Sequence, residues 1–180
     1  MKYLIHYSTK GGVGKSTISK IAHQVLADNN QKKVAGEDLD PQQHYADWMG
    51  KNASLVSSEE SSDYFIYDTQ GAHTKANEEL LCAVKSVEAI VLIPVRPSID
   101  DMKEAERIAT RLKRIGIQNK CIFFFNGCIA NCSYKDYREV LEGFGIKVAR
   151  KQINTRKAFA EKPTLREIND ISALLLEVLL

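Results

Sequence analysis

The sequence predicts an α/β fold of three layers, in which a mostly parallel, twisted sheet is covered by helices on both faces. Three observations support it. Continuous apolar runs such as 89–95 and 121–125 are typical of strands buried on both sides. These runs alternate along the chain with segments of helical periodicity, as expected for a parallel sheet with crossover helices. The length of 180 residues fits one domain, which we place at 1–180.

The strands are expected where short apolar runs end in polar residues. They are placed at 3–7, 33–37, 64–67, 89–95, 121–125 and 146–149. In a parallel α/β sheet, ligands bind at the carboxyl ends of the strands. Candidate functional residues are therefore sought in the loops after Tyr7, Glu37, Tyr67, Val95 and Phe125.

The helices are expected where apolar residues recur at spacings of three and four. They are placed at about 18–27, 44–49, 77–84, 100–115, 134–141 and 165–179, with a further helix-like stretch from Thr155. The polar residues 28–30 end the first helix, Pro41 can open the second, and Gly116 closes the long charged helix. The serine-rich segment 51–63 is expected to be a loop or a shortened connection.

Composition argues against a membrane-spanning protein. The chain is 44% hydrophobic and 27% charged, and its net charge of +2 is too small to imply a nucleic-acid partner by itself. The longest apolar runs, 89–95 and 174–180, are far shorter than a membrane span. The N-terminus leads directly into a strand, so no signal peptide is expected and a cytoplasmic location is predicted.

Four cysteines fit a reducing compartment. Cys82 and Cys121 are expected in the core. The spacing of Cys128 and Cys132 leaves a metal or Fe–S role open, although the second ligand pair that a structural zinc site needs does not follow them.

A glycine-rich stretch, residues 8–17, joins the first strand to the first helix. Its three glycines let several backbone N–H groups turn toward an anion, and the helix N-terminus adds partial positive charge. Lys15 can bridge the β- and γ-phosphates of a nucleotide, and the Ser16 hydroxyl can ligate Mg²⁺. The stretch therefore predicts a phosphate-binding loop, the alternative being an ordinary turn that opens a helix.

The start of this loop departs from the usual pattern. Thr9 stands where such loops normally have their first glycine, and a second lysine, Lys10, begins the turn. Lys10 lies too early to share the role of Lys15. It can instead reach outward, toward a phosphate held by another subunit.

Carboxylates follow two of the strands. Asp68 ends the 64–67 strand, where a Walker B carboxylate acts on the metal through a water molecule. Asp38 can serve the same metal shell, which leaves Asp40 to orient or deprotonate the attacking water. Alternatively, Asp38 and Asp40 cap the helix behind Pro41.

Two more strand ends carry candidate contacts. Residues 68–71 have the form Asp-x-x-Gly, and the Gly71 amide can sense a γ-phosphate as switch loops do. Asn126 can read a purine edge through its side-chain amide, or it can simply start a turn before Gly127.

Residues 10–17 resemble the deviant Walker A motif of the ParA/MinD family of P-loop ATPases. Residues 38–42, Asp-Leu-Asp-Pro-Gln, resemble the family's Asp-x-Asp-Pro-Gln segment in the form closest to its ParA, or partition, branch. The order of later elements is also similar, so the resemblance covers most of the chain. One departure is Thr69-Gln70, where the family often has two prolines.

The resemblance implies an ATPase that holds ATP and Mg²⁺ in a homodimer and hydrolyses ATP to ADP and phosphate. Lys10 would reach the partner subunit's nucleotide, Thr17 would contact the α-phosphate, and Asn126 the base. The implied catalytic residues are Lys10, Lys15 and Asp40, and the implied metal residues are Ser16, Asp38 and Asp68. The implied nucleotide-binding residues are Lys10, Gly11, Gly12, Val13, Gly14, Lys15, Ser16, Thr17 and Asn126.

The resemblance also implies non-specific DNA binding, association with the nucleoid, and a ParB-type centromere-binding partner that stimulates hydrolysis. Residues 147–166 contain seven basic side chains and one acidic one, as a DNA-backbone contact would need. The candidate DNA contacts are Arg150, Lys151, Arg156, Lys157, Lys162 and Arg166. A solvated surface is the alternative. The face shared by Lys103, Arg107, Arg111 and Arg114 is diluted by neighbouring glutamates.

Other branches fit less well. A membrane-binding protein like MinD would need a basic amphipathic C-terminal helix, but residues 167–180 contain no Lys or Arg. An Fe–S carrier would need cysteines at the dimer face, for which Cys128 and Cys132 are poor candidates. Operator binding is not expected, because no helix-turn-helix extension is seen. A nucleotide-gated scaffold that positions a protein complex rather than DNA remains open.

Overall fold

The structure, a computed structural model, describes residues 1–155 and 163–179. Its main sheet has the strand order β2–β3–β1–β4–β5–β6, and a short β7 pairs with the end of β5. The strands are β1 (Lys2–His6), β2 (Val34–Asp38), β3 (Tyr64–Asp68), β4 (Ala89–Val95), β5 (Cys121–Cys128), β6 (Lys147–Val148) and β7 (Ile153–Asn154). Every strand pair is parallel, which confirms the predicted fold class.

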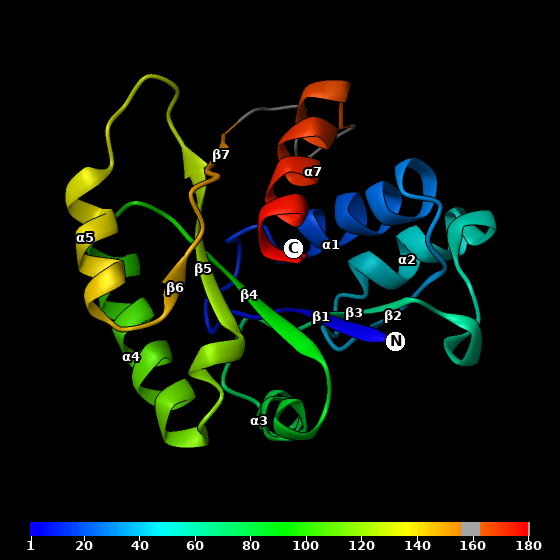
Figure 1. Cartoon of the computed structure of the whole chain (residues 1–180), viewed down its shortest axis with the longest axis horizontal. Helices are drawn as coiled ribbons and strands as arrows, with labels where there is room; N and C mark the ends of the chain where they lie inside the picture. Colours follow the sequence, from blue (N-terminus) through cyan, green and yellow to red (C-terminus); the bar gives the residue numbers. More distant parts are fainter. Residues whose placement is uncertain (156–162, 180) are drawn as a thin grey trace.

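Helices cover both faces of the sheet (Figure 1). One face is covered by α1 (Lys15–Gln24), α2 (His44–Lys51) and α7 (Leu165–Leu179). The other is covered by α3 (Lys75–Ala83), α4 (Ile99–Ile115) and α5 (Lys135–Gly143). The chain leaves β1 toward β2 on one side and leaves β4 toward β5 on the other. The switch point at which such sheets bind ligands therefore lies between the carboxyl ends of β1 and β4.

The sheet separates two apolar cores because side chains alternate across each strand. In β5, Phe123 and Phe125 enter the core under α4 and α5, while Phe124 enters the core under α1 and α7, and all three are fully buried. Burial of each ring contributes about 1.5–3 kcal/mol to folding. The apolar face of α7 lies in this second core, as a core helix requires.

Several element boundaries differ from the sequence prediction. Helix α1 passes into a π-helical turn at Val25–Asn29, β5 continues beyond Asn126, and β6 is shorter than predicted. Single 3₁₀ turns lie at Ala53–Leu55, Glu59–Ser61, Val84–Ser86 and Gln118–Lys120. The helix-like stretch predicted from Thr155 falls mainly on residues 156–162, outside the described residues.

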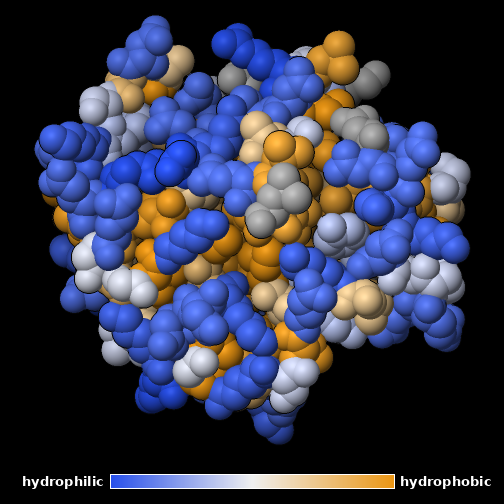
Figure 2. Space-filling model, viewed as in Figure 1, coloured by the Kyte–Doolittle hydropathy of each residue, from blue (hydrophilic) through white to orange (hydrophobic). Residues whose placement is uncertain are grey.

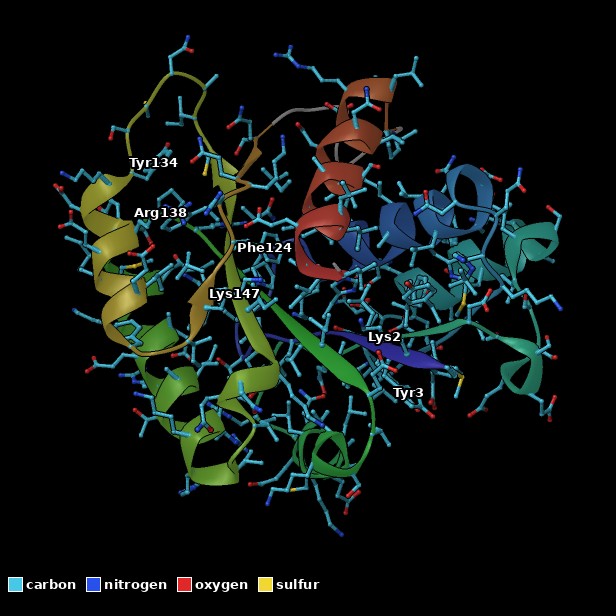
Figure 3. The ribbon with its side chains drawn as sticks, viewed as in Figure 1. Lys2, Tyr3, Phe124, Tyr134, Arg138 and Lys147 are labelled. Carbon is cyan, nitrogen blue, oxygen red and sulfur yellow. The ribbon has the colours of Figure 1, made fainter. Side chains whose placement is uncertain are left out.

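The side chain of Arg138 ties α5 to the edge of the sheet (Figure 3). Its guanidinium lies 5.6 Å from the centre of the Phe125 ring. Its Nη1 and Nη2 donate to the carbonyl oxygens of Ala149 and Arg150, at 2.9 and 3.3 Å. Hydrophilic side chains cover most of the face seen in Figure 2, with apolar residues showing between them. Within residues 1–155 and 163–179, no helix is long and apolar enough to cross a membrane.

The cysteines divide into two buried and two exposed. Cys121 and Cys128 are buried, whereas Cys132 is exposed, so the latter two do not face a common site. Cys82 is also exposed, and its predicted core position is wrong because its neighbour Leu81 carries the buried face of α3. In the described part of the chain, no group of three or more His, Cys, Asp or Glu side chains could hold a metal ion.

Candidate functional site

The glycine-rich loop follows β1 and opens α1, as predicted. Gly12 and Gly14 have φ angles of +70° and +95°, in the left-handed region that glycine adopts without strain. A Cβ atom on Gly14 would also lie 2.5 Å from Asn126 Nδ2. Two separate constraints, backbone conformation and space, therefore require glycine at position 14.

A cavity of about 590 Å³ lies over this loop and collects residues from the ends of β1, β2 and β3. It is lined by Gly11, Gly12, Gly14, Lys15, Ser16, Thr17, Asp40, Pro41, Gln42, His44, Gln70 and Gly71. Most of the predicted loop residues thus meet Asp40 in one place, whereas Lys10 is not part of the lining and Val13 is buried beneath the loop. Sequence reasoning gave no site role to Gln42 and His44. Their position directly after the Asp40-Pro41 pair was the available signal.

The surroundings of the Lys15 ammonium group favour the binding of an anion. Its side chain is 6% exposed, and Nζ donates to the Lys10 carbonyl oxygen at 3.3 Å. Burial lowers the pKa of Lys15, although the nearby charges of Asp68 and Asp40 act in the opposite direction. A charge that is poorly hydrated in this way gains more from a bound phosphate than an exposed lysine would.

Asp68 lies fully buried behind the cavity, at the end of β3. Burial raises its pKa to about 6, and the nearby hydroxyl groups of Ser16 and Ser19 oppose that shift. Its Oδ1 accepts from Ser19 Oγ at 3.2 Å, while Oδ2 has no hydrogen-bond partner within the described residues. An unpaired carboxylate oxygen next to a serine hydroxyl fits the oxygen ligands and water molecules that surround Mg²⁺.

Asp38 makes the contacts of a helix cap. Its Oδ2 accepts from the backbone N–H groups of Tyr45 and Ala46 at 2.8 and 3.1 Å, in the first turn of α2. Its Oδ1 accepts from the Asp40 N–H at 2.9 Å. Helix capping, the alternative considered from the sequence, therefore describes Asp38, and its place at a metal stays a prediction.

Asp40 is partly exposed and lines the cavity. Its Oδ1 accepts from the Gln42 N–H at 3.0 Å. The Gln43 side chain donates to the carbonyl oxygens of Asp38 and Asp40 at 3.0 and 2.8 Å, which braces the turn. The Asp40 carboxylate is thus held at the wall of the cavity on a fixed turn.

Helix α4 holds the start of the glycine-rich loop. Lys10 Nζ forms an ion pair with Asp101 Oδ2 at 2.9 Å, and the Thr9 hydroxyl donates to Glu104. The Thr9 hydrogen bond lowers the pKa of Glu104. Both partners lie in the N-terminal third of α4, so this helix fixes residues 9 and 10 within one chain. Sequence reasoning missed Asp101 and Glu104, because nothing in the local pattern shows which helix will face the loop.

The loop after β3 presses against the glycine-rich loop. A Cβ atom on Gly71 would lie 2.8 Å from the Gly11 Cα and N atoms and from the Lys10 carbonyl oxygen. The buried Asn77 amide donates to the Gln70 and Ala72 carbonyl oxygens at 3.0 and 2.9 Å, which fixes the shape of the loop. The two loops are therefore in close contact, and position 71 has no room for a side chain.

Asn126 contacts the glycine-rich loop directly. Its Nδ2 donates to the Val13 carbonyl oxygen at 2.7 Å, and the side chain is 8% exposed. The amide nitrogen therefore supports the loop, while the amide oxygen is not used in this hydrogen bond. The predicted base contact stays a prediction.

The candidate DNA contacts fall into two groups. Arg156, Lys157 and Lys162 lie outside the described residues. Arg150 and Arg166 are exposed, whereas Lys151 is neutralised by Asp170 at 2.6 Å.

The basic face of α4 is also partly neutralised. It borders a hollow of about 540 Å³ lined by His73, Lys103, Glu106, Arg107, Thr110, Arg111 and Arg114. Arg107 pairs with Glu104, and Arg111 pairs with Glu78, each at 3.1 Å. This surface therefore has less net positive charge than its arginines suggest.

Known proteins match both the sequence and the fold. A family model described as the CobQ/CobB/MinD/ParA nucleotide binding domain matches residues 4–167. The virulence plasmid ParA family protein pGP5-D of Chlamydia trachomatis is 28% identical over 131 residues, which cover 72% of this chain and 47% of that protein. The chain thus spans about half the length of this curated relative.

Solved structures of low sequence identity share the fold. A putative plasmid partition protein of Borrelia burgdorferi B31, bound to AMPPNP, superposes with a TM-score of 0.70 at 16% identity over 97% of this chain and 98% of that one. The MinD cell division protein of Aquifex aeolicus gives 0.69 at 16% identity, over 98% and 97% of the two chains. Because the family model covers most of its length, this chain belongs to the CobQ/CobB/MinD/ParA nucleotide-binding domain family.

Proposed function

We propose that this chain is a Mg²⁺-dependent ATPase of ParA type that acts in DNA partition. The observation that carries the proposal is that Lys15, Ser16 and Asp40 line the same cavity, with the buried Asp68 behind it. A clamp for phosphates, a metal position and a carboxylate beside the attacking water are the parts that phosphoryl transfer to water requires.

The residues would divide the work as follows. The loop N–H groups and Lys15 hold the phosphates, Thr17 contacts the α-phosphate, and the Asn126 amide oxygen accepts from the base. Asp40, fixed by its turn, orients the attacking water and accepts its proton. Ser16 and, through water, Asp68 and Asp38 would hold Mg²⁺, which neutralises charge on the phosphates when bound.

The proposed active form is a homodimer around ATP. In one chain, the Lys10 ammonium rests on Asp101. On dimerisation, Lys10 exchanges this carboxylate for the phosphates of the nucleotide in the partner subunit. The exchange replaces one anion with another, so the lysine is never left without a counter-charge.

Two variants test the catalytic assignment. Asp40→Ala should abolish most ATP hydrolysis but retain ATP binding, whereas Lys10→Ala should lose ATP-dependent dimerisation. The matched controls are Asp47→Ala and Lys32→Ala, which change exposed side chains outside the cavity. Phosphate release and sedimentation are the measurements. Normal hydrolysis by Asp40→Ala would remove the proposed base, and normal dimers of Lys10→Ala would remove the cross-subunit contact.

The proposed DNA binding is non-specific, is made by the ATP dimer and places the protein on the nucleoid. It is supported by the exposed Arg150 and Arg166 in the basic C-terminal segment. Retention on unrelated DNA sequences should require ATP and fall steeply with salt, and Arg166→Ala should reduce the salt slope by about one. Protein that stays free of DNA at low salt with ATP would contradict this part of the proposal.

A ParB-type centromere-binding partner is proposed to stimulate hydrolysis. The alternative is a MinD-like or nucleotide-gated scaffold that positions a protein complex, and the ion pair that neutralises Lys151 favours it. ATPase rates separate the two functions. Stimulation by DNA together with a ParB-type protein supports partition, whereas a slow rate that DNA does not change supports the scaffold.

A further inference from the structure

A chain of buried polar side chains runs beneath the cavity. It joins His6 at the end of β1, Ser19 in α1 and Asp68 at the end of β3, and all three side chains are fully buried. His6 Nδ1 lies 2.7 Å from Ser19 Oγ, and Ser19 Oγ lies 3.2 Å from Asp68 Oδ1. His6 and Asp68 are also direct neighbours in the pairing of β1 with β3.

The direction of the hydrogen bonds between His6, Ser19 and Asp68 follows from the number of protons that these side chains carry. Burial and the nearby Lys15 charge lower the pKa of His6 to about 3, so its ring is neutral near pH 7 and carries one N–H. The Ser19 hydroxyl has one proton and, among residues 1–155 and 163–179, three hydrogen-bonding neighbours: His6 Nδ1, Asp68 Oδ1 and the Lys15 carbonyl oxygen at 3.1 Å. A hydrogen bond to a carboxylate is about twice as strong as one to a neutral acceptor, so the proton favours Asp68.

The position of the ring proton follows in turn. If Ser19 donates to Asp68, its oxygen can only accept from His6, which places the ring proton on Nδ1. His6 Nε2 has no partner within the described residues. A buried lone pair without a partner costs less than a buried N–H without one, so the same tautomer is also the less costly one at Nε2.

We infer that His6 and Ser19 are positioning residues for Asp68: His6 Nδ1–H donates to Ser19 Oγ, and Ser19 O–H donates to Asp68 Oδ1. The chain holds one carboxylate oxygen and leaves Oδ2 as the oxygen directed to the proposed metal shell. This inference rests on the proposed function for its purpose. The hydrogen-bond chain itself can be tested without nucleotide.

The first test is the tautomer of His6. The ¹⁵N chemical shifts of its ring should show a protonated Nδ1 and an unprotonated Nε2, the reverse of the tautomer that free histidine prefers. In Ser19→Ala the Nδ1 proton loses its acceptor, so the ring signals should change. A wild-type protein with protonated Nε2 would overturn the inference.

The second test is the Mg²⁺ dependence of nucleotide binding, followed with a fluorescent ATP analogue rather than by turnover. Ser19→Ala should raise the Mg²⁺ concentration for half-maximal binding roughly 10- to 100-fold, as loss of an outer-shell partner does. The matched control is Ser62→Ala, which removes a buried hydroxyl that donates to the Ser58 carbonyl oxygen. An unchanged Mg²⁺ requirement in Ser19→Ala would overturn the inference.

Variants at His6 separate orientation from packing. An asparagine amide can place an N–H near the position of Nδ1, so His6→Asn should retain most of the wild-type Mg²⁺ dependence. His6→Leu fills the site without a donor and should shift the requirement in the direction of Ser19→Ala. Equal behaviour of the two His6 variants would overturn the role of His6.

The two proposals fail in different ways. A wild-type protein that binds the analogue with no dependence on Mg²⁺ would overturn the proposed function, and the tautomer measurement would still decide the hydrogen-bond chain. A Mg²⁺-dependent wild type with the wrong tautomer would overturn the inference alone.

Discussion

At the scale of single residues, the unusual threonine of the glycine-rich loop has a partner. The Thr9 hydroxyl binds Glu104, and the next residue, Lys10, pairs with Asp101. A glycine at position 9 would offer no such contact. The departure from the usual motif is therefore explained by helix α4, which lies far away in the sequence.

The Lys10–Asp101 pair predicts the effect of a charge change. Asp101→Asn should shift ATP-dependent dimerisation to about two- to fivefold lower protein concentration, because a half-exposed pair contributes about 0.5–1 kcal/mol that opposes release of Lys10. Sedimentation with ATP measures this. Asp100→Asn, on the exposed side of α4, is the control. Weaker dimerisation of Asp101→Asn would contradict the exchange of partners.

The buried ring of His6 should make the free energy of unfolding depend on pH. Its folded-state pKa is lowered to about 3, against 6.5 for the free side chain. Between these values the unfolded chain binds a proton that the folded chain does not, so stability is lost as the pH falls. From pH 7 to pH 5 the loss should be about 2 kcal/mol, and His6→Asn should lack it. Urea unfolding of both proteins at pH 7 and pH 5 measures the difference, and an equal loss in both would contradict the assignment.

At the scale of elements, the close contact of two loops limits what can stand at position 71. Gly71→Ala should weaken nucleotide binding and destabilise the fold by about 1–3 kcal/mol, because the new Cβ meets backbone atoms of residues 10 and 11. Gly50→Ala is the matched control. Its Cβ would meet nothing within 4 Å and it lies within α2, so it should be neutral or stabilising. Denaturant midpoints and analogue binding measure both, and an unchanged Gly71→Ala would contradict the loop contact.

Elements and motifs differ in how far they could be predicted from the sequence. Strand β4 and helix α7 were placed at their observed bounds, because long apolar periodic segments carry their own signal. The place of the glycine-rich loop and of Asp40 beside it could be predicted because both belong to local sequence patterns. Asp101, Glu104, Ser19 and His6 were missed because each acquires its role from a partner at least 13 residues away. Asp38 shows that a local pattern can also be ambiguous, because an aspartate at a strand end can either bind a metal ion or cap the next helix.

At the scale of the whole molecule, a ligand that binds in the cavity over the glycine-rich loop should raise the free energy of unfolding. A ligand at about 100 times its Kd adds about 2.7 kcal/mol to the free energy of unfolding. Since each 1 kcal/mol shifts the melting temperature by about 2–4 °C for a chain of this size, ATP with Mg²⁺ should raise it by about 5–11 °C. Lys15→Ala should remove most of the increase because it loses the buried cation, while Lys32→Ala should keep it. Calorimetry measures both, and an equal rise in Lys15→Ala would contradict the site.

The short strand β6 at one edge of the main sheet limits how two molecules can meet. Strand β6 has only two residues, and one of them is the exposed Lys147 (Figure 3). A short, charged border offers few backbone groups to a neighbouring chain, so it discourages growth into a continuous intermolecular sheet. The proposed dimer, which forms through the loop face, then meets little competition from pairing along this border. A protein that must assemble and separate repeatedly gains from a border that resists permanent aggregation.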